Sequence, residues 1–104
     1  MEPTVTAMEV RPLRDIQVVD VTTGIAGPYC TKLFADAGAE VIKVETATGD
    51  PLRRYAATTE VPLGEDGALF RYLNAGKKSI IARVDDARVD DLLAGADLIV
   101  EDLP

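Results

Sequence analysis

One passage near the start of the chain constrains the fold more than any other. Residues 16–21 are mostly apolar and β-branched, residues 24–27 begin and end with glycine, and Pro28 follows directly. Runs of β-branched residues favour strands, and proline is favoured at the first position of a helix. In α/β proteins, a strand that passes through a glycine turn into a helix presents backbone N–H groups to a phosphate. The passage therefore predicts a strand–turn–helix unit whose turn binds a ligand.

The rest of the chain continues this alternation. Four apolar residues at helical spacing indicate a helix after the turn, and we expect them to face the core: Tyr29, Leu33, Phe34 and Ala37. Gly38 is suited to end that helix, and residues 40–45 form a second expected strand. Two more strands, with a helix between them, are expected over residues 79–84 and 97–101. The order β-α-β-loop-β-α-β predicts an α/β protein with a partial, Rossmann-like parallel sheet.

Two segments lack a periodic pattern. Residues 1–12 end in a proline, and we interpret them as a flexible lead before a domain that covers residues 13–104. Residues 46–69 hold three glycines and two prolines without a sustained period. A stretch of this length is usually a binding loop, a lid or disordered. The apolar residues 70–73 that follow it are compatible with a short strand or a helical turn.

The composition argues against several classes of function. The chain has 104 residues, a formal net charge of −7, one cysteine and no histidine. The acidic balance argues against nucleic acid as a partner, and the residue counts argue against common zinc clusters and Ser-His-Asp catalysis. No apolar run reaches the roughly 20 residues that a membrane span needs, and the start lacks the apolar region of a signal peptide. We therefore expect a cytoplasmic protein without a metal or a tightly bound cofactor.

The glycine turn departs from the dinucleotide-binding fingerprint. Its two glycines are three positions apart instead of two, and Pro28 removes an N–H group that a pyrophosphate would use. Glu45 does end the second strand about 20 residues later, where such folds keep a ribose-binding acid. The sequence therefore meets only one of the two requirements of a nicotinamide-binding domain, the acid and not the glycine spacing. This alternative stays open. A purely structural role, in which the glycines let helix and strand pack closely, stays open as well.

The other candidate residues each have a structural interpretation as well as a functional one. Residues 76–79 lack the leading glycine and the spacing of a P-loop, yet two adjacent lysines at a turn suit either a phosphate or a solvated hairpin. Arg53, in the long loop, suits a phosphate contact or a surface ion pair. Asp20 lies inside the first strand without an evident partner. Cys30 falls beside the apolar helical face and is expected in the core.

Six blocks of sequence occur in a specific order along the chain, at residues 19–22, 26–28, 36–45, 49–53, 73–80 and 96–104. Together they resemble class III CoA-transferases of the CaiB/BaiF type. That family includes formyl-CoA transferase, carnitine CoA-transferases and α-methylacyl-CoA racemase. The resemblance covers about residues 13–104.

The resemblance implies a Rossmann-like fold, an interlocked homodimer, and CoA or acyl-CoA as a substrate that lies over the ends of parallel strands. It places the glycine turn in the CoA pocket and the two lysines near the adenosine and its phosphates. Carried over by position, the implied CoA-contacting residues are Gly24, Ile25, Ala26, Arg53, Leu73, Asn74, Lys77, Lys78, Asp102 and Leu103.

Two features of the resemblance bear on activity. Asp102 and Leu103 stand where the family has Asn-Phe, which puts a carboxylate near an anionic ligand and removes an aromatic contact. The family's catalytic aspartate lies downstream of the matched region, so we expect no catalytic residue here. The chain is then expected to be the first, truncated or degenerate part of a CoA-transferase or an acyl-CoA racemase. The alternative is a non-catalytic module that binds CoA or serves assembly.

Overall fold

The computed structural model describes residues 11–58 and 60–103. Most of the expected lead, residues 1–12, therefore lies outside the described residues. The elements in chain order are β1 (Gln17–Val21), α2 (Ala26–Asp36), β2 (Glu40–Glu45), the 3₁₀ helix η1 (Pro51–Arg54), α3 (Ala68–Asn74), β3 (Lys78–Ile81), α4 (Ala87–Gly95) and β4 (Leu98–Glu101). None of the helices in this described part is long and apolar enough to cross a membrane.

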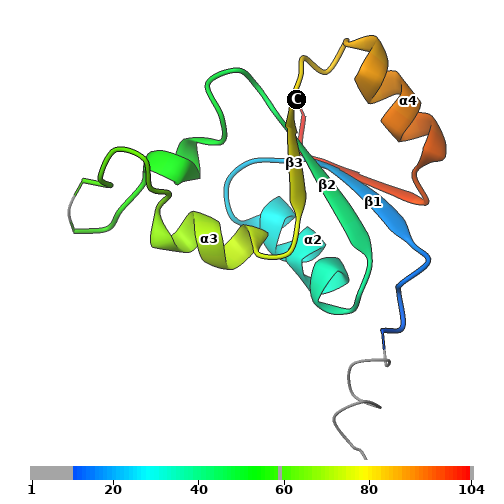
Figure 1. Cartoon of the computed structure of the whole chain (residues 1–104), viewed down its shortest axis with the longest axis horizontal. Coiled ribbons are helices and arrows are strands. Elements are labelled where there is room, and N and C mark those ends of the chain that lie inside the picture. The colour runs from blue at the N-terminus through cyan, green and yellow to red at the C-terminus, as the bar shows by residue number, and fades with distance from the viewer. Residues whose placement is uncertain (1–10, 59, 104) are drawn as a thin grey trace, which may run out of the picture.

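The strands form one parallel sheet in the order β3-β2-β1-β4 (Figure 1). In β1, Val19 lies opposite Ile42 of β2 on one side and Ile99 of β4 on the other. This arrangement confirms the predicted α/β class and the Rossmann-like parallel sheet. The chain moves outward from β1 to β3 and then returns to pair β4 with β1. Such a reversal is a topological switch point, where a crevice opens at the carboxyl ends of the strands.

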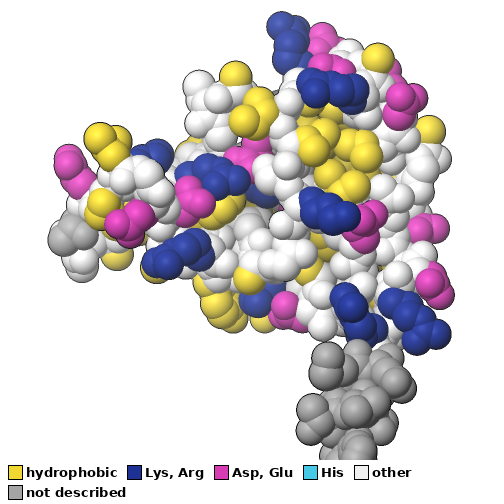
Figure 2. Space-filling view, viewed as in Figure 1, with side chains coloured by type: hydrophobic (Ala, Val, Ile, Leu, Met, Phe, Trp, Pro, Cys, Tyr) yellow, Lys and Arg dark blue, Asp and Glu magenta, His cyan; other side chains and the backbone are white. Residues whose placement is uncertain are grey.

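Helices cover both faces of the sheet. Consecutive strand residues point to opposite faces, so Val18 packs near Phe34 of α2 while Val19 packs with Val89 of α4. All three valines are fully buried, and each such side chain contributes about 1.5–3 kcal/mol. Figure 2 shows hydrophobic side chains visible between β3 and α4, so this helix covers its face of the sheet only in part.

The beginning of α2 lies against the end of β1 more closely than a side chain would allow. A Cβ atom on Gly27 would lie 2.4 Å from the Cβ of Thr22. The helix begins at Ala26, so Pro28 occupies the third helical position and not the first. Its missing N–H costs nothing there, because the first four N–H groups of a helix have no partner within the helix. Close packing is therefore one role of this glycine.

The buried face of α2 agrees with the predicted apolar face only in part, because Phe34 packs against the core while other residues of that face do not. Tyr29 and Leu33 are 45% and 52% exposed, and Cys30, which we expected in the core, is exposed too. Thr31 is buried instead. The reason is that β1 presents the buried carboxylate of Asp20 to this helix, and a hydroxyl donor satisfies that carboxylate where an apolar side chain would not.

The aperiodic segment between β2 and α3 is more ordered than its sequence indicates. It contains η1, which begins after Asp50, and the side chain of Asp50 caps that helix by accepting a backbone N–H. Further along, the guanidinium of Arg54 donates to the backbone oxygens of Val61 and Glu65. These bonds from side chain to backbone need no periodic pattern. Of the two alternatives for the segment that follows, the helical one is confirmed by α3.

Candidate functional site

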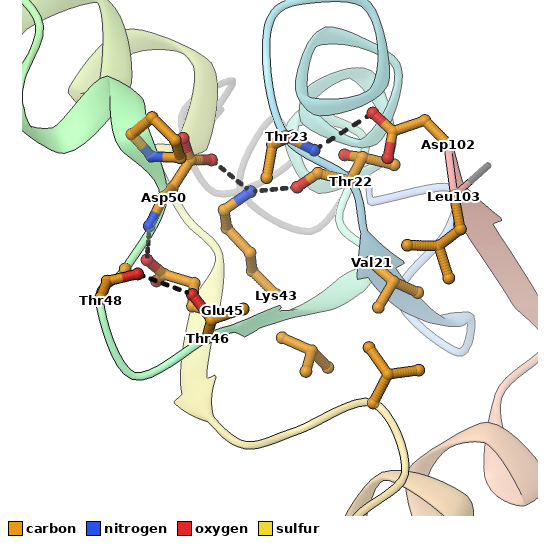
Figure 3. A pocket seen from close by; sticks show the side chains of 14 residues that line it. Val21, Thr22, Thr23, Lys43, Glu45, Thr46, Thr48, Asp50, Asp102 and Leu103 are labelled. Atoms are coloured by element: carbon orange, nitrogen blue, oxygen red, sulfur yellow. Dashed lines mark hydrogen bonds and ion pairs between the residues drawn. The ribbon is translucent and has the colours of Figure 1, made fainter.

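A pocket of about 300 Å³ opens at the carboxyl ends of the strands, beside the switch point (Figure 3). Its walls are residues 21–23 at the end of β1, 43–46 at the end of β2, 48–51 in the next loop, and 102–103 after β4. Val84, which follows β3, completes the lining. Strand ends at a switch point are the usual ligand site of open parallel sheets. This pocket is therefore the candidate functional site.

The end of β4 is tied to the end of β1 across the pocket. The backbone N–H of Thr23 donates to Oδ2 of Asp102 at 3.3 Å. The strands are paired in register up to Val21 and Glu101, so the residues that follow each strand arrive at the same place. Asp102 and Leu103, two of the predicted CoA-contacting residues, thus lie beside the glycine turn although they are distant from it in sequence.

A fully buried carboxylate lies beneath the glycine turn. Asp20 accepts hydrogen bonds from the hydroxyls of Thr22 at 2.5 Å and Thr31 at 2.6 Å. The Nζ of Lys77 lies 3.2 Å from the same carboxylate. Burial acts to raise the pKa of Asp20, but the two hydroxyls and the nearby ammonium groups outweigh burial and hold that pKa below its ordinary value. The group therefore stays charged and holds β1 against α2.

Lys77 belongs to this buried network and not to an open basic surface. Its Nζ donates to the backbone oxygen of Pro28 at 2.9 Å and to Oδ1 of Asn74 at 2.7 Å. The side chain is only 1% exposed. Burial lowers the pKa of Lys77, and the carboxylate of Asp20 opposes that change. Lys77 thus connects the turn before β3 to the first turn of α2.

A second buried pair lines the pocket itself. The Nζ of Lys43 donates to the backbone oxygen of Thr22 at 2.9 Å and lies 2.9 Å from Oδ2 of Asp50 (Figure 3). Neither side chain of this pair is more than 1% exposed. A charge buried this deeply is strongly unfavourable without its partner. The pair therefore holds the loop after β2 against the ends of β1 and β2.

Arg53 clamps the same loop onto the end of β2. Its Nε and Nη2 donate to the two carboxylate oxygens of Glu45 at 2.8 and 2.6 Å, and Nη1 donates to Asp66 at 2.8 Å. The guanidinium lies 4.2 Å from the ring centre of Phe70, within the range of a cation–π contact. The hydroxyl of Ser79 also donates to Glu45. Both oxygens of this carboxylate are thus engaged, which argues against the ribose-binding role that a nicotinamide site would require.

These contacts shift the pKa values of the clamp. The hydrogen bonds from Arg53, together with those from Ser79 and the backbone of Asp50, lower the pKa of Glu45 to about 2 against the opposing effect of burial. The same pairing raises the pKa of Arg53. The clamp is therefore charged on both sides at any pH near neutrality.

The low pKa of Glu45 predicts an acid-sensitive contribution to stability. A carboxyl group whose folded pKa is depressed stabilises the fold above its unfolded pKa and loses that effect as the pH falls through the folded pKa. For Glu45 the window runs from 4.5 down to about 2. We expect Glu45→Gln to lower the free energy of unfolding at pH 7 by about 1–3 kcal/mol. The difference from the unmodified chain should shrink at pH 3, as measured by urea unfolding.

The control for this experiment is Asp91→Asn, which removes an exposed carboxylate of α4 outside the pocket. It should leave the pH dependence of unfolding as it is in the unmodified chain. If the difference caused by Glu45→Gln were as large at pH 3 as at pH 7, the Glu45–Arg53 pairing would not be the source of the effect.

The remaining predicted site residues lie in different surroundings. Gly24, Ile25 and Ala26 are exposed next to the pocket without lining it. Leu73 is a core residue, 2% exposed. The Nζ of Lys78 pairs with Glu40 at 2.6 Å, near the opposite, amino-terminal end of β2. The structure therefore brings Asp102 and Leu103 to the turn, and it does not bring Arg53, Leu73, Asn74, Lys77 or Lys78 into the pocket.

Sequence reasoning missed Lys43 and Asp50 as pocket residues. A lysine between apolar strand positions is a usable signal, because a buried charge requires a partner. An aspartate before Pro51 is likewise a helix-capping signal. The interpretation of Asp20 as lacking an evident partner was wrong. Its hydroxyl partner Thr31 and its ammonium partner Lys77 are 11 and 57 positions away, distances at which a local pattern gives no indication.

Three comparisons with known proteins bear on this site. Cinnamoyl-CoA:phenyllactate CoA-transferase of Clostridium sporogenes is 36% identical over 90 residues, which are 82% of this chain and 22% of that protein. Succinyl-CoA:glutarate CoA-transferase of Homo sapiens is 33% identical over 97 residues, 88% of this chain and 22% of that protein. A CaiB/BaiF family protein from Brucella suis has a solved structure that matches with a TM-score of 0.80 and 34% identity, covering 91% of this chain and 26% of that one.

The chain spans about a quarter of the length of these relatives. The family model described as CoA-transferase family III matches residues 13–104, which are nearly the whole of this chain. The match includes every strand of the sheet, the glycine turn and both residues after β4 that line the pocket. The chain therefore belongs to CoA-transferase family III.

Proposed function

We propose that this chain forms one wall of the CoA site in an enzyme that transfers CoA between carboxylic acids. The observation that carries the proposal is the pocket at the switch point, where Asp102 is hydrogen-bonded to the backbone of Thr23 beside the glycine turn. Transfer is preferred to racemisation because the relatives described above are named as CoA-transferases. No residue of this chain is assigned the covalent step.

The chain's own residues would contribute binding and positioning. The hydroxyls of Thr46 and Thr48 and the exposed backbone of the glycine turn offer polar contacts at the strand ends. Val21 and Leu103 offer an apolar wall. Behind them, the buried ion pairs fix the backbone, so that the wall is formed before a ligand arrives. Such preorganisation reduces the loss of conformational entropy when a ligand binds.

The proposal predicts that CoA perturbs a defined set of backbone amides. In a titration of the ¹⁵N-labelled 104-residue chain with CoA, we expect shifts at Gly24, Ile25 and Leu103, with smaller changes over α4. NAD serves as the matched control, because it carries a pyrophosphate and adenosine but no pantetheine chain, and it should leave these amides unchanged. Absence of any shift with millimolar CoA would rule the proposal out, and a response to NAD alone would favour the dinucleotide alternative.

A further inference from the structure

A second cavity, of about 290 Å³, lies at the amino-terminal ends of the strands, opposite the switch-point pocket. It is lined by Arg11 and Arg14 before β1, by residues 38–41 at the beginning of β2, and by Gly76 and Lys78 at the beginning of β3. Its volume is close to the lower end of the range of ligand pockets, about 300 Å³. None of its lining residues lines the switch-point pocket. The two cavities are therefore separate.

The charge of this second cavity is opposite to that of the whole chain. Its lining holds three cations, Arg11, Arg14 and Lys78, and one carboxylate, Glu40, whereas the chain has a net charge of −7. The carboxylate of Glu40 is engaged by the Nζ of Lys78 at 2.6 Å. Among the described residues, no carboxylate forms an ion pair with Arg11 or Arg14. Figure 2 shows Lys and Arg side chains close together at this end of the sheet. The two guanidinium groups can therefore meet an anionic ligand.

The backbone fixes both arginines beside the cavity. The N–H of Arg14 donates to the backbone oxygen of Arg11 at 3.1 Å, which closes a turn. The N–H of Leu13, within this turn, donates to the backbone oxygen of Ala37 at 3.0 Å. Gly38 has a φ of +103°, and a Cβ atom on it would lie 2.7 Å from the Cβ of Arg11. The turn is thus held against the end of α2, and less conformational entropy is lost when a ligand binds.

The end of α2 does not need the arginine side chains. Its last carbonyl groups accept hydrogen bonds from the backbone N–H groups of Ala37, Gly38 and Ala39. Guanidinium groups present a planar set of donors that matches two oxygens of a phosphate or a carboxylate. A phosphate has enough oxygens to meet two guanidinium groups at once, and its double charge suits a cavity with an excess of cations. The lining therefore favours phosphate over a monocarboxylate.

We propose that this cavity binds a phosphate group through Arg11 and Arg14, with Lys78 as a third cation. Glu40 limits the affinity, because it holds the ammonium of Lys78 and repels an anion. The ligand is either inorganic phosphate or the phosphate group of a small molecule. The site lies outside the proposed CoA pocket and does not depend on it.

Titrations of the ¹⁵N-labelled 104-residue chain test this assignment at constant ionic strength, with inorganic phosphate, glycerol 2-phosphate and acetate as the probes. We expect phosphate to cause saturable shifts at the amides of Gly38, Ala39 and Gly76, and to leave Leu103 of the switch-point pocket unchanged. Acetate should cause no saturable shift. A response to inorganic phosphate alone assigns the site to the free ion, and a response to the ester as well assigns it to phosphorylated small molecules.

Two variants test the roles of individual side chains. Arg14→Gln should weaken phosphate binding about fivefold, because it removes one charged donor group. Glu40→Gln should strengthen binding by a similar factor, because it removes a negative charge and releases Lys78. Both substituted side chains are exposed, and the amide spectrum of each variant reports directly whether the fold persists.

The matched control is Arg83→Gln, which removes an exposed arginine that follows β3 at the opposite end of that strand. It should leave the phosphate titration unchanged. The proposal would be overturned if phosphate caused no saturable shift, or if acetate shifted the same amides with equal affinity. Equal weakening by Arg83→Gln and Arg14→Gln would also overturn it, because the effect would then come from the net charge of the chain.

Discussion

Asp20→Asn is expected to reduce the free energy of unfolding by about 3–5 kcal/mol. The substitution keeps the size of a fully buried side chain and removes its charge. The ammonium of Lys77, 3.2 Å away and 1% exposed, would then remain buried without its carboxylate. The hydroxyl of Thr31 would lose its charged acceptor as well. Urea unfolding at pH 7, followed by circular dichroism, measures the difference, and a loss of this size is large for a domain of this length.

Two companion variants isolate the cause. Asp36→Asn removes an exposed partner of Lys32 on α2 and should change stability by no more than about 0.5 kcal/mol. Combining Asp20→Asn with Lys77→Met removes both members of the buried pair, so the double variant should lose less than the sum of the two single losses. Equal stability of Asp20→Asn and Asp36→Asn would show that the buried pair contributes nothing.

Gly27→Ala is expected to cost about 1–3 kcal/mol and to displace the beginning of α2. The new Cβ would lie 2.4–2.6 Å from three side-chain atoms of Thr22, which is itself buried and bonded to Asp20. The clash can be relieved only if the side chain of Thr22 moves and breaks its hydrogen bond, or if the beginning of α2 moves away. The displaced turn should also weaken any ligand that contacts Ile25 and Ala26. Thermal unfolding and the amide shifts of the turn measure the two effects.

The matched glycine is Gly95, the last residue of α4, where an added Cβ would meet no atom within 4 Å. Gly95→Ala should be neutral or stabilise by as much as about 1 kcal/mol, since alanine restricts the unfolded chain. A Gly27→Ala variant that matched Gly95→Ala in stability would mean that the close approach of α2 to β1 is not required.

The sheet could be predicted from the sequence because its strands are recognisable from local patterns of apolar residues. The β-branched runs of β1 and β2 and the alternation of strands with helices indicated parallel strands, and all four were found. Gly38, expected to end a helix, follows α2 with a φ of +103°, a conformation that favours glycine. β3 ends at Ile81, three residues before its expected end, because residues 82–84 lead toward α4.

The buried polar contacts could not be predicted from local patterns of this kind. The face of α2 was predicted only in part, because a single carboxylate on the neighbouring strand reverses the usual preference for apolar residues at Thr31. The two lysines at the beginning of β3 were assigned to the neighbourhood of ligand phosphates, and in the structure Lys77 is enclosed by Asp20 and Asn74. The two lysines are adjacent in sequence and have opposite surroundings, which only the packing of the helices decides.

The buried charges also bear on how the sheet finds a single alignment. Asp20 lies opposite Lys43 of β2, and Lys43 in turn lies opposite Ser79 of β3, so the polar groups form a row across the strands. A slip of β1 by one residue would turn Asp20 toward the apolar side occupied by Val19, where no donor awaits it. Runs of valine and isoleucine alone would tolerate such a slip far better. The row of polar groups therefore fixes the register of the strands, because a misaligned sheet would bury these groups without their partners. This effect does not depend on a ligand.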